Sequence, residues 1–273
     1  MPEKFYRSVV ITDLEALGHS YARLTFEFPD LAEQARPGQF VSISRRRPDF
    51  PLLPRPFSIH RVLSDGGVSI LFKIVGPGTR QLGSLKVGEE ISVLGPLGKG
   101  VFRIRPDRPH VLLVAGGIGV APFLFLAEKL GEQPKLKSTL IFGGRTKNDL
   151  PAHDDFQPLE ISIVPVTEDG SRGRHGLATD ELRDALSYAD PELTQVLACG
   201  PKPMLQVVAG LCHDACVPCQ VSLEVMMACG VGSCRGCAVE IVDSSKIQEP
   251  NYSRVCVEGP VFEAETLRWT VFE

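Results

Sequence analysis

The cysteines of this chain lie close together in its C-terminal third, at a spacing that suits metal chemistry. Cys229, Cys234 and Cys237 form a C-x₄-C-x₂-C motif, and Cys256 follows after an 18-residue gap. One loop that supplies three thiolates and a distant segment that supplies a fourth are typical of a plant-type [2Fe–2S] cluster. Glycines lie between the cysteines of the motif, where they favour tight turns that bring backbone N–H groups towards the sulfur atoms. The spacing therefore predicts a [2Fe–2S] cluster held by these four cysteines.

Zinc binding and disulfide bonding are the alternative uses of these cysteines. Structural zinc sites usually contain two C-x₂-C pairs, and the motif contains one. Disulfides need an oxidising compartment, whereas the N-terminal sequence MPEKFYRSVV lacks the charged-then-apolar pattern of a signal peptide. All eight cysteines lie between residues 199 and 256, and this crowding indicates a local metal centre. We therefore expect a cytoplasmic iron–sulfur protein.

A second cysteine set overlaps this region. Cys212, Cys216 and Cys219 have the C-x₃-C-x₂-C spacing of radical-SAM [4Fe–4S] loops, but those loops come early in a large barrel, and only 54 residues follow Cys219. Cys212 and Cys216 instead fall one turn apart on a predicted helix. Packing is the preferred interpretation of this set, and a second metal is the alternative.

Composition narrows the class of protein. The chain has 273 residues, of which 43% are hydrophobic and 23% charged, as in ordinary soluble proteins. A net charge of −4 argues against a nucleic-acid binder. The one basic run, at 45–47, is either a solvated loop end or a neighbour of an anionic cofactor. The uncharged run at 111–127 contains three glycines and a proline, so we expect no membrane span.

The pattern of apolar residues divides the chain into three parts. Short alternating segments separated by Gly, Pro and Asp predict a small antiparallel barrel without helices over residues 1–104. Its six strands are expected at 6–11, 21–28, 39–44, 57–62, 68–75 and 90–94. Strands alternate with helices over residues 105–218, which indicates a parallel sheet flanked by helices. Its strands are expected at 111–115, 138–142, 161–166 and 195–199, and its helices at 121–130, 178–187 and 203–215. Residues 219–273 form a small cluster module, with strands expected at 238–242 and 254–257.

Two motifs in the predicted barrel suit a ligand that combines a planar ring with a pyrophosphate. The tetrapeptide at 55–58 offers an arginine for a pyrophosphate, an aromatic ring for stacking and a hydroxyl for a ring nitrogen. Further on, Gly78 and Thr79 can present backbone N–H groups to phosphate. The structural alternatives are an ordinary strand start and a hairpin turn.

Two motifs in the predicted sheet suit a nicotinamide nucleotide. Gly116, Gly117 and Gly119 join a strand to a helix, where glycine backbone can approach a pyrophosphate at the helix N-terminus. A tight strand–helix turn is the alternative. Cys199 and Gly200 end the last strand before residue 218, and strand ends in such sheets face the ligand crevice. Buried packing is the alternative for Cys199.

In their order along the chain, the motifs RPFS, GPGT, GGIGVAP and CGP resemble those of the ferredoxin–NADP⁺ reductase superfamily. The segments LEVMMACGVGSCRGCAVE and RVCVEGPVF are similar to the electron transfer subunit family of dihydroorotate dehydrogenase B (NAD⁺). The resemblance implies FAD, a [2Fe–2S] cluster and NAD, and a separate FMN-bearing catalytic subunit in a heterotetramer with two chains of each kind. Electrons would pass from that subunit through the cluster and FAD to NAD⁺.

The resemblance also assigns residues. It implies cluster ligands at Cys229, Cys234, Cys237 and Cys256. It implies FAD contacts at Arg55, Pro56, Phe57, Ser58, Phe72, Lys73, Ile74, Gly78 and Thr79. The gap before Cys256 is longer than the family suggests, which leaves the loop at 243–252 in doubt.

Other functions stay open at this point. One is a subunit of another NAD(P)H-linked ferredoxin or sulfide oxidoreductase. Another is a non-catalytic iron–sulfur regulator that retains a flavin fold. The choice between NAD and NADP is open as well, because Arg145, Arg172 and Arg174 are either contacts for a 2′-phosphate or surface charges.

Overall fold

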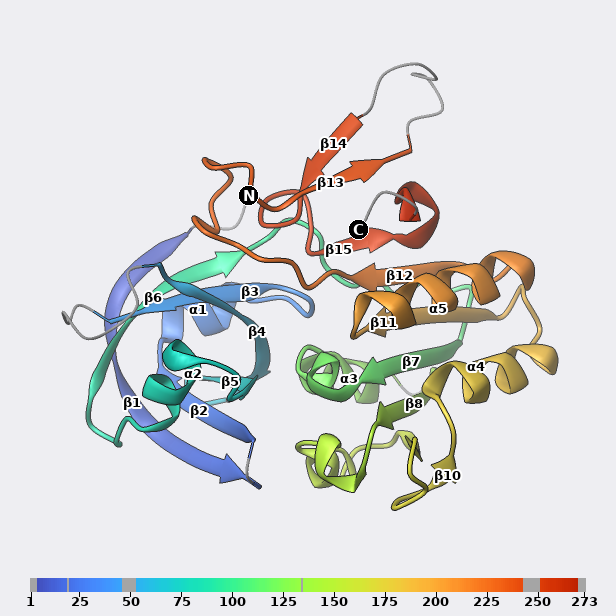
Figure 1. The fold of residues 1–273 in the computed structure, drawn as a ribbon, viewed down its shortest axis with the longest axis horizontal. Coiled ribbons are helices and arrows are strands. Elements are labelled where there is room, and N and C mark those ends of the chain that lie inside the picture. Colours follow the sequence, from blue (N-terminus) through green and yellow to red (C-terminus); the bar gives the residue numbers. More distant parts are fainter. Residues whose placement is uncertain (1–3, 19, 46–52, 134, 243–250, 270–273) are drawn as a thin grey trace.

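The computed structural model describes residues 4–18, 20–45, 53–133, 135–242 and 251–269. A β-barrel lies beside an α/β sheet, and a two-stranded ribbon projects from the pair (Figure 1). Arg46, Arg47 and most of the loop at 243–252 fall outside the described residues. In the part of the chain that is described, no helix combines the length and the apolar character needed to cross a bilayer.

The barrel is closed by six antiparallel strands in the order β1-β2-β5-β4-β3-β6, which confirms the predicted architecture. Its interior follows from the two-residue period: Ala22, Leu24 and Phe26 of β2 all point into the barrel core and are buried. The strands are β1 (Phe5–Leu17), β2 (Tyr21–Glu27), β3 (Phe40–Ser44), β4 (Arg55–Val62), β5 (Gly67–Lys73) and β6 (Glu90–Leu97).

The expectation of a helix-free barrel was wrong. Helices α1 (Pro29–Gln34) and α2 (Pro77–Gly83) are too short to show a helical period, and each begins with a proline in its first turn. In α2, the Thr79 hydroxyl accepts hydrogen bonds from the backbone N–H groups of Val75 and Gly76, at 2.9 and 3.1 Å. Gly78 and Thr79 therefore lie in a capped helical turn rather than in a hairpin.

The second part is a seven-stranded sheet in the order β10-β9-β8-β7-β11-β12-β15, parallel except for the last pair. The four predicted strands are present as β7 (His110–Gly116), β8 (Lys137–Gly144), β9 (Ser162–Thr167) and β11 (Thr194–Cys199). The sheet also contains β10 (Arg174–His175), β12 (Cys219–Ser222) and β15 (Val261–Glu263). Strands β12 and β15 come from the predicted cluster module, so the large sheet crosses the predicted domain boundary between residues 218 and 219. That boundary stays a prediction.

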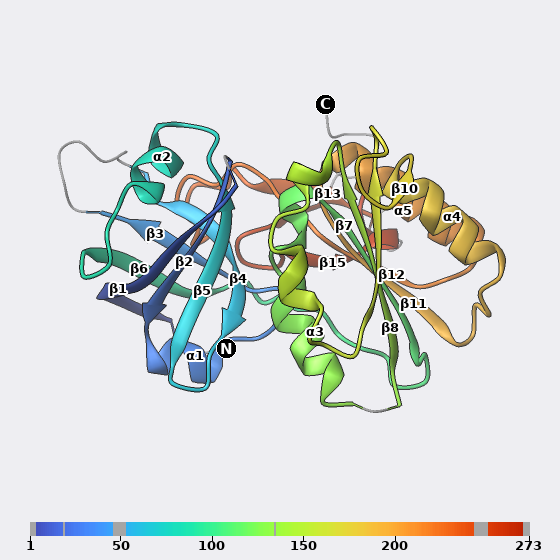
Figure 2. The ribbon, with the colours of Figure 1, turned by 90° about the horizontal axis from the view of Figure 1, so that it is seen from below.

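Helices cover both faces of the sheet. Helix α3 (Phe123–Gly131) lies between the sheet and the barrel, whereas α4 (Ala178–Ser187) and α5 (Lys202–Asp214) cover the opposite face (Figure 2). Neighbouring residues of β7 show this arrangement, because Leu113 packs in the core with α3 and Val114 in the core with α4 and α5. A 3₁₀ turn, η1 (Gly117–Val120), precedes α3, so the helix begins two residues later than predicted.

The ribbon of the cluster module consists of β13 (Ala238–Ile241) and β14 (Asn251–Arg254). The strand expected at 254–257 was wrong, because the Arg254 carbonyl accepts hydrogen bonds from the backbone N–H groups of Val257 and Glu258 and so starts a tight turn. This turn carries Cys256, and β15 then returns to the large sheet. A short 3₁₀ turn, η4 (Ala264–Thr266), ends the module.

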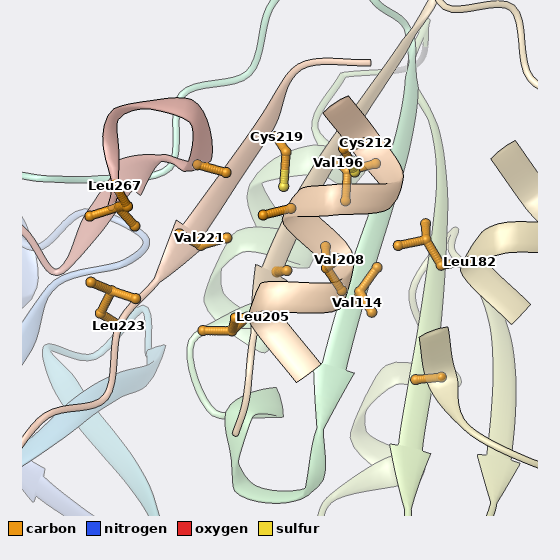
Figure 3. Packing of buried hydrophobic residues seen from close by; sticks show 14 of the residues in the cluster. Val114, Leu182, Val196, Leu205, Val208, Cys212, Cys219, Val221, Leu223 and Leu267 are labelled. Atoms are coloured by element: carbon orange, nitrogen blue, oxygen red, sulfur yellow. The ribbon is translucent and has the colours of Figure 1, made fainter. Parts of the chain in front are cut away.

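The second cysteine set is mainly packing. Cys212 and Cys219 are 1% and 7% exposed and lie in the same core between α5 and β12 (Figure 3). Cys216 differs from the expectation, because α5 ends at Asp214 and leaves Cys216 exposed in a left-handed conformation at φ 56°. The packing interpretation therefore holds for Cys212 and Cys219 and is wrong for Cys216.

Candidate functional site

A cavity of about 490 Å³ lies between the barrel and the sheet domain. Of the nine residues predicted to contact FAD, seven line it: Arg55, Pro56, Phe57, Ser58, Phe72, Lys73 and Thr79. Adjacent strands β4 and β5 bring the two aromatic side chains together, with the ring centroids of Phe57 and Phe72 5.5 Å apart. We call this cavity the flavin cleft.

The other two predicted residues do not line the flavin cleft. Ile74 packs against the barrel core, and Gly78 is buried within α2. Arg55 stands at the first position of β4, where its guanidinium donates a 2.6 Å hydrogen bond to the Leu53 carbonyl and stays part-exposed. A positive charge thus lies at the edge of an aromatic-lined cleft, which suits a ligand with a planar ring and a phosphate group.

A second cavity of about 500 Å³ opens at the carboxyl ends of the sheet strands. Gly116 and Gly117 line it, as predicted, together with Gly143 and Gly144 at the end of β8. Gly117 has a φ of 54°, and a Cβ added there would point into open space, with only the Tyr21 hydroxyl within 4.0 Å. The backbone at Gly117 is therefore open to a ligand. We call this cavity the nucleotide cleft.

Gly119, Cys199 and Gly200 line neither cleft, contrary to expectation. A Cβ at Gly119 would lie 2.3 Å from the Cys199 carbonyl oxygen, so this glycine serves close packing of η1 against β11. Cys199 is fully buried, and burial raises the pKa of its thiol well above the usual range. Gly200 packs against Gly116 and Met204. The sequence signal was a strand end, and the residues that line the nucleotide cleft there are Pro201, Pro203 and Met204, which follow Gly200.

The flavin cleft and the nucleotide cleft meet. Lys73, Ile118 and Glu224 line both of them. Glu224, which follows β12, was not predicted as a site residue. Its side chain opens to the clefts, and desolvation by the surrounding protein raises the pKa of its carboxyl. Ligands that fill both cavities would therefore approach one another across these three side chains.

A polar network that was not predicted from the sequence lies where the two clefts meet, on the nucleotide side of Lys73. Asp149 accepts hydrogen bonds from the Tyr21 hydroxyl, at 2.9 Å, and from the Lys73 ammonium, at 3.1 Å. Burial alone would raise the pKa of Asp149, but the hydrogen bonds from Lys73 and Tyr21 outweigh it and lower that pKa. The network ties the barrel to the loop after β8. The position of Asp149 just beyond a strand end was the available signal.

The three arginines considered for a 2′-phosphate lie in different places. Arg145 lines the nucleotide cleft and pairs with Asp149, with 3.4 Å between Nε and Oδ2. Arg174 pairs with Glu181 and Asp184, and Arg172 pairs with Asp154, and neither arginine lines the cleft. Glu168, which directly follows β9, lines the cleft as well.

The four cysteines of the predicted cluster form no disulfide bonds with one another and fall into two pairs. The Cys234 backbone N–H donates to the Cys229 sulfur, 3.4 Å away, and the Cys237 and Cys256 sulfurs are 3.2 Å apart. Cys237 and Cys256 are buried, whereas Cys234 is exposed. Among the described residues, no three His, Cys, Asp or Glu side chains converge as a mononuclear metal site requires. Two pairs of thiols suit a cluster of two irons, each of which takes two thiolates.

The surroundings of these thiols also fit such a cluster. Backbone hydrogen bonds, first from Cys234 and also from Val231 and Ser233, lower the pKa of Cys229 to about 6. Burial and the hydrogen bond with Cys237 raise the pKa of Cys256 to about 12, because a second thiolate beside Cys237 is unfavourable without a cation. The Gly236 N–H donates to the Cys234 sulfur at 3.4 Å, as the glycine spacing suggested. The loop thus supplies thiolate-stabilising donors, and iron would supply the charge that the buried pair lacks.

The segment from Met226 to Cys237, which we call the cluster loop, lies against the flavin cleft. Met226 and Met227 line that cleft, and Cys229 follows two residues later. A Cβ at Gly230 would come within 3.6 Å of the Ser42 hydroxyl on β3, so the loop rests on the barrel wall. The chain therefore places its thiols, its aromatic cleft and its nucleotide cleft in one continuous row.

Family models match two parts of the chain. The iron–sulfur cluster binding domain of dihydroorotate dehydrogenase B matches residues 224–268, and the oxidoreductase NAD-binding domain matches residues 113–210. A solved structure of an NADH-dependent reduced ferredoxin–NADP oxidoreductase, described for flavin-based electron bifurcation, covers 96% of this chain and 90% of its own, with 29% identity and a TM-score of 0.81. A ferredoxin NADP⁺ reductase from Neisseria gonorrhoeae, with bound FAD and NADP, has 18% identity and a TM-score of 0.67 over 77% of this chain and 91% of its own, and so supports the fold alone.

Curated relatives cover almost the whole chain. The dihydroorotate dehydrogenase B (NAD(+)) electron transfer subunit of Desulforamulus reducens is 38% identical over 247 residues, which are 90% of this chain and 92% of that protein. The subunit of the same name from Caldanaerobacter subterraneus is 38% identical over 242 residues, or 89% of this chain and 90% of that protein. With its clefts and cysteines in this arrangement, the chain belongs to the family of dihydroorotate dehydrogenase B (NAD(+)) electron transfer subunits.

Proposed function

We propose that this chain passes electrons from a [2Fe–2S] cluster through FAD to NAD⁺, and that a separate catalytic subunit oxidises dihydroorotate. One observation carries the proposal: the flavin cleft touches the nucleotide cleft at Lys73, Ile118 and Glu224 and the cluster loop at Met226 and Met227. A flavin exchanges hydride with a nicotinamide and single electrons with a cluster, so it belongs between the two.

The residues of the chain have distinct roles in this proposal. Arg55 neutralises the FAD pyrophosphate by a charge-assisted fork, Phe57 and Phe72 contact the flavin ring, and Ser58 offers it a hydrogen bond. Gly117 lets the nicotinamide nucleotide approach the backbone of the turn after β7. Cys229, Cys234, Cys237 and Cys256 hold the cluster.

The cluster ligands also suggest where electrons enter. Cys229 is partly exposed and Cys234 is exposed, whereas Cys237 and Cys256 are buried. The exposed pair offers a short route to a docked protein, which we propose to be an FMN-bearing dihydroorotate dehydrogenase subunit in a heterotetramer with two chains of each kind. The names of the relatives support such a partner.

Reconstitution tests this division of labour. The purified chain should oxidise NADH with artificial electron acceptors and show no dihydroorotate-dependent reduction of NAD⁺. Addition of the FMN-bearing subunit should restore that reaction. Turnover of dihydroorotate by the isolated chain would contradict the proposal.

A second candidate is a subunit of an NAD(P)H-linked ferredoxin oxidoreductase. The structural likeness at a TM-score of 0.81 and 29% identity favours it. The chain that co-purifies with the native protein separates the two candidates, because a dihydroorotate dehydrogenase subunit supports the first and a ferredoxin-linked subunit the second.

The nucleotide cleft gives a further prediction. Gly117→Val should slow the reduction of FAD by NADH at least about tenfold, because a branched side chain is strained at φ 54° and projects towards the ligand. Stopped-flow reduction with NADH measures the effect, and dithionite should still reduce the variant. Gly210→Val is the matched control, because Gly210 on α5 has no atom within 4 Å of its added Cβ. Reduction by NADH at the rate of the unmodified chain in Gly117→Val would place the nucleotide elsewhere.

A further inference from the structure

An arginine that is no cluster ligand connects the two segments that carry the cysteines. Arg254 is the last residue of β14 and lies two residues before Cys256. Its Nη1 donates a 3.3 Å hydrogen bond to the carbonyl of Gly232, which lies in the loop between Cys229 and Cys234. The side chain therefore reaches from the turn that contains Cys256 to the cluster loop, which contains Cys229, Cys234 and Cys237.

Glu258 holds this arginine in place. Its carboxylate accepts hydrogen bonds from the Arg254 Nη2, at 2.6 Å, from Nε, at 3.2 Å, and from the Arg254 backbone N–H, at 2.7 Å. The three bonds close the turn that contains Cys256. Both side chains are a little over one-third exposed, so the pair lies at the rim of the module. A bidentate pair of this kind orients the guanidinium more firmly than a single contact does.

Gly232 is the point where the two segments meet. Its φ is 90°, and an added Cβ would lie 2.6 Å from Val257 and 3.1 Å from Arg254 Nη1. Gly232 therefore packs against the Cys256 turn at Val257, and its carbonyl accepts the hydrogen bond from Arg254.

The guanidinium also lies next to both segments that carry cluster ligands. Arg254 is two residues from Cys256, and its Nη1 contacts Gly232, which lies between Cys229 and Cys234. A positive charge beside a cluster stabilises the reduced form more than the oxidised form, because reduction adds a negative charge. A carboxylate at the same place has the opposite effect.

We propose that Arg254 and Glu258 form a charged clamp that joins the Cys256 turn to the cluster loop and sets the reduction potential of the cluster. The positive charge of Arg254 raises the potential, and the negative charge of Glu258 lowers it. Neither residue is a ligand, and together they position the two segments that carry the ligands. The inference rests on the proposed set of four cysteine ligands.

Opposite shifts in potential test the clamp. In the purified holoprotein, Arg254→Gln should lower the midpoint potential of the cluster and Glu258→Gln should raise it, as measured by redox titration followed by electron paramagnetic resonance. A tenfold change in the reduction equilibrium corresponds to 59 mV for one electron. Arg254→Lys keeps the charge and should stay closer to the unmodified protein than Arg254→Gln does. Arg268→Gln is the matched control, because Arg268 pairs with Glu240 on β13 at 2.7 Å and should leave the potential unchanged.

The outcomes separate the clamp from the ligand assignment. Shifts of Arg254→Gln and Glu258→Gln in the same direction, or no shift in either, would overturn the clamp. If Arg254→Gln binds no cluster, Glu258→Gln must still raise the potential and Arg254→Lys must still stay near the unmodified value. A cluster that persists in the cysteine variants would overturn the ligand set, whatever the clamp variants show.

Discussion

Cys256→Ser is expected to remove the iron–sulfur cluster while leaving the flavin in place. Cys256 is 2% exposed, and its sulfur lies 3.2 Å from that of Cys237, so no water or neighbouring ligand can take its position without rearrangement. Loss of groups that merely support metal ligands costs about 10–100-fold in affinity, so loss of a ligand should cost at least that much. Iron content should therefore fall at least about tenfold from roughly two irons per chain.

Iron analysis and the visible spectrum measure this effect, with Cys216→Ser as the matched control. Cys216 is exposed and lies outside the loop, so its variant should keep its iron. NADH oxidation with artificial acceptors should survive in Cys256→Ser, because the flavin cleft and the nucleotide cleft are unchanged. Four or more irons in the unmodified chain, or retention of iron in Cys256→Ser, would contradict the assignment.

Arg55→Ala should yield a folded protein that is depleted of FAD. Arg55 is a cationic residue at the edge of the aromatic flavin cleft, and its guanidinium donates a 2.6 Å hydrogen bond to the Leu53 carbonyl. A charge-assisted contact to phosphate contributes about 2–3 kcal/mol. Its loss should weaken FAD binding roughly 30- to 150-fold.

Fluorescence titration of the apoprotein with FAD measures this affinity. Arg61→Ala is the control, because Arg61 lies on the same strand and pairs with Glu128 on α3, at 2.7 Å, outside the flavin cleft. Unchanged FAD affinity in Arg55→Ala would remove Arg55 from the site. A matching loss in Arg61→Ala would indicate that domain packing, and not phosphate binding, determines the affinity.

Periodic elements were predictable from the sequence. Helix α4 occupies Ala178–Ser187 as predicted, because Leu182 and Leu186 make one apolar stripe on an otherwise polar helix. The barrel strands followed from alternation, as in β2. Helices α1 and α2 were missed because one or two turns carry no period, and only their leading prolines marked them.

The backbone N–H contacts to the Cys229 and Cys234 sulfurs could be predicted from the cysteine motif, because the cysteines and the glycines lie in one loop. The nucleotide site was less predictable. Gly119 and Cys199 stand in suitable positions along the chain, yet they pack against one another, since the sequence does not show which face of a turn the neighbouring strand covers. Glu224 and Asp149 gave only the weak signal of following a strand.

The meeting of the two clefts could not be predicted. It depends on contacts between residues far apart in the chain, such as Lys73 with Asp149 and Arg23 with Asp155. These ion pairs fix the barrel against the sheet, and α3 packs between the two. No local pattern encodes such a contact, because either partner alone resembles a surface charge.

Anaerobic reduction of the single chain by NADH tests the central claim most directly. NADH donates hydride and cannot reduce a one-electron cluster efficiently without a flavin between them. Electron paramagnetic resonance should therefore show a reduced cluster after NADH is added to the unmodified chain. No such signal should appear in protein stripped of FAD, although dithionite should still generate it there. Rapid reduction of the cluster by NADH in the FAD-free protein, or none in the complete protein, would contradict the proposed path.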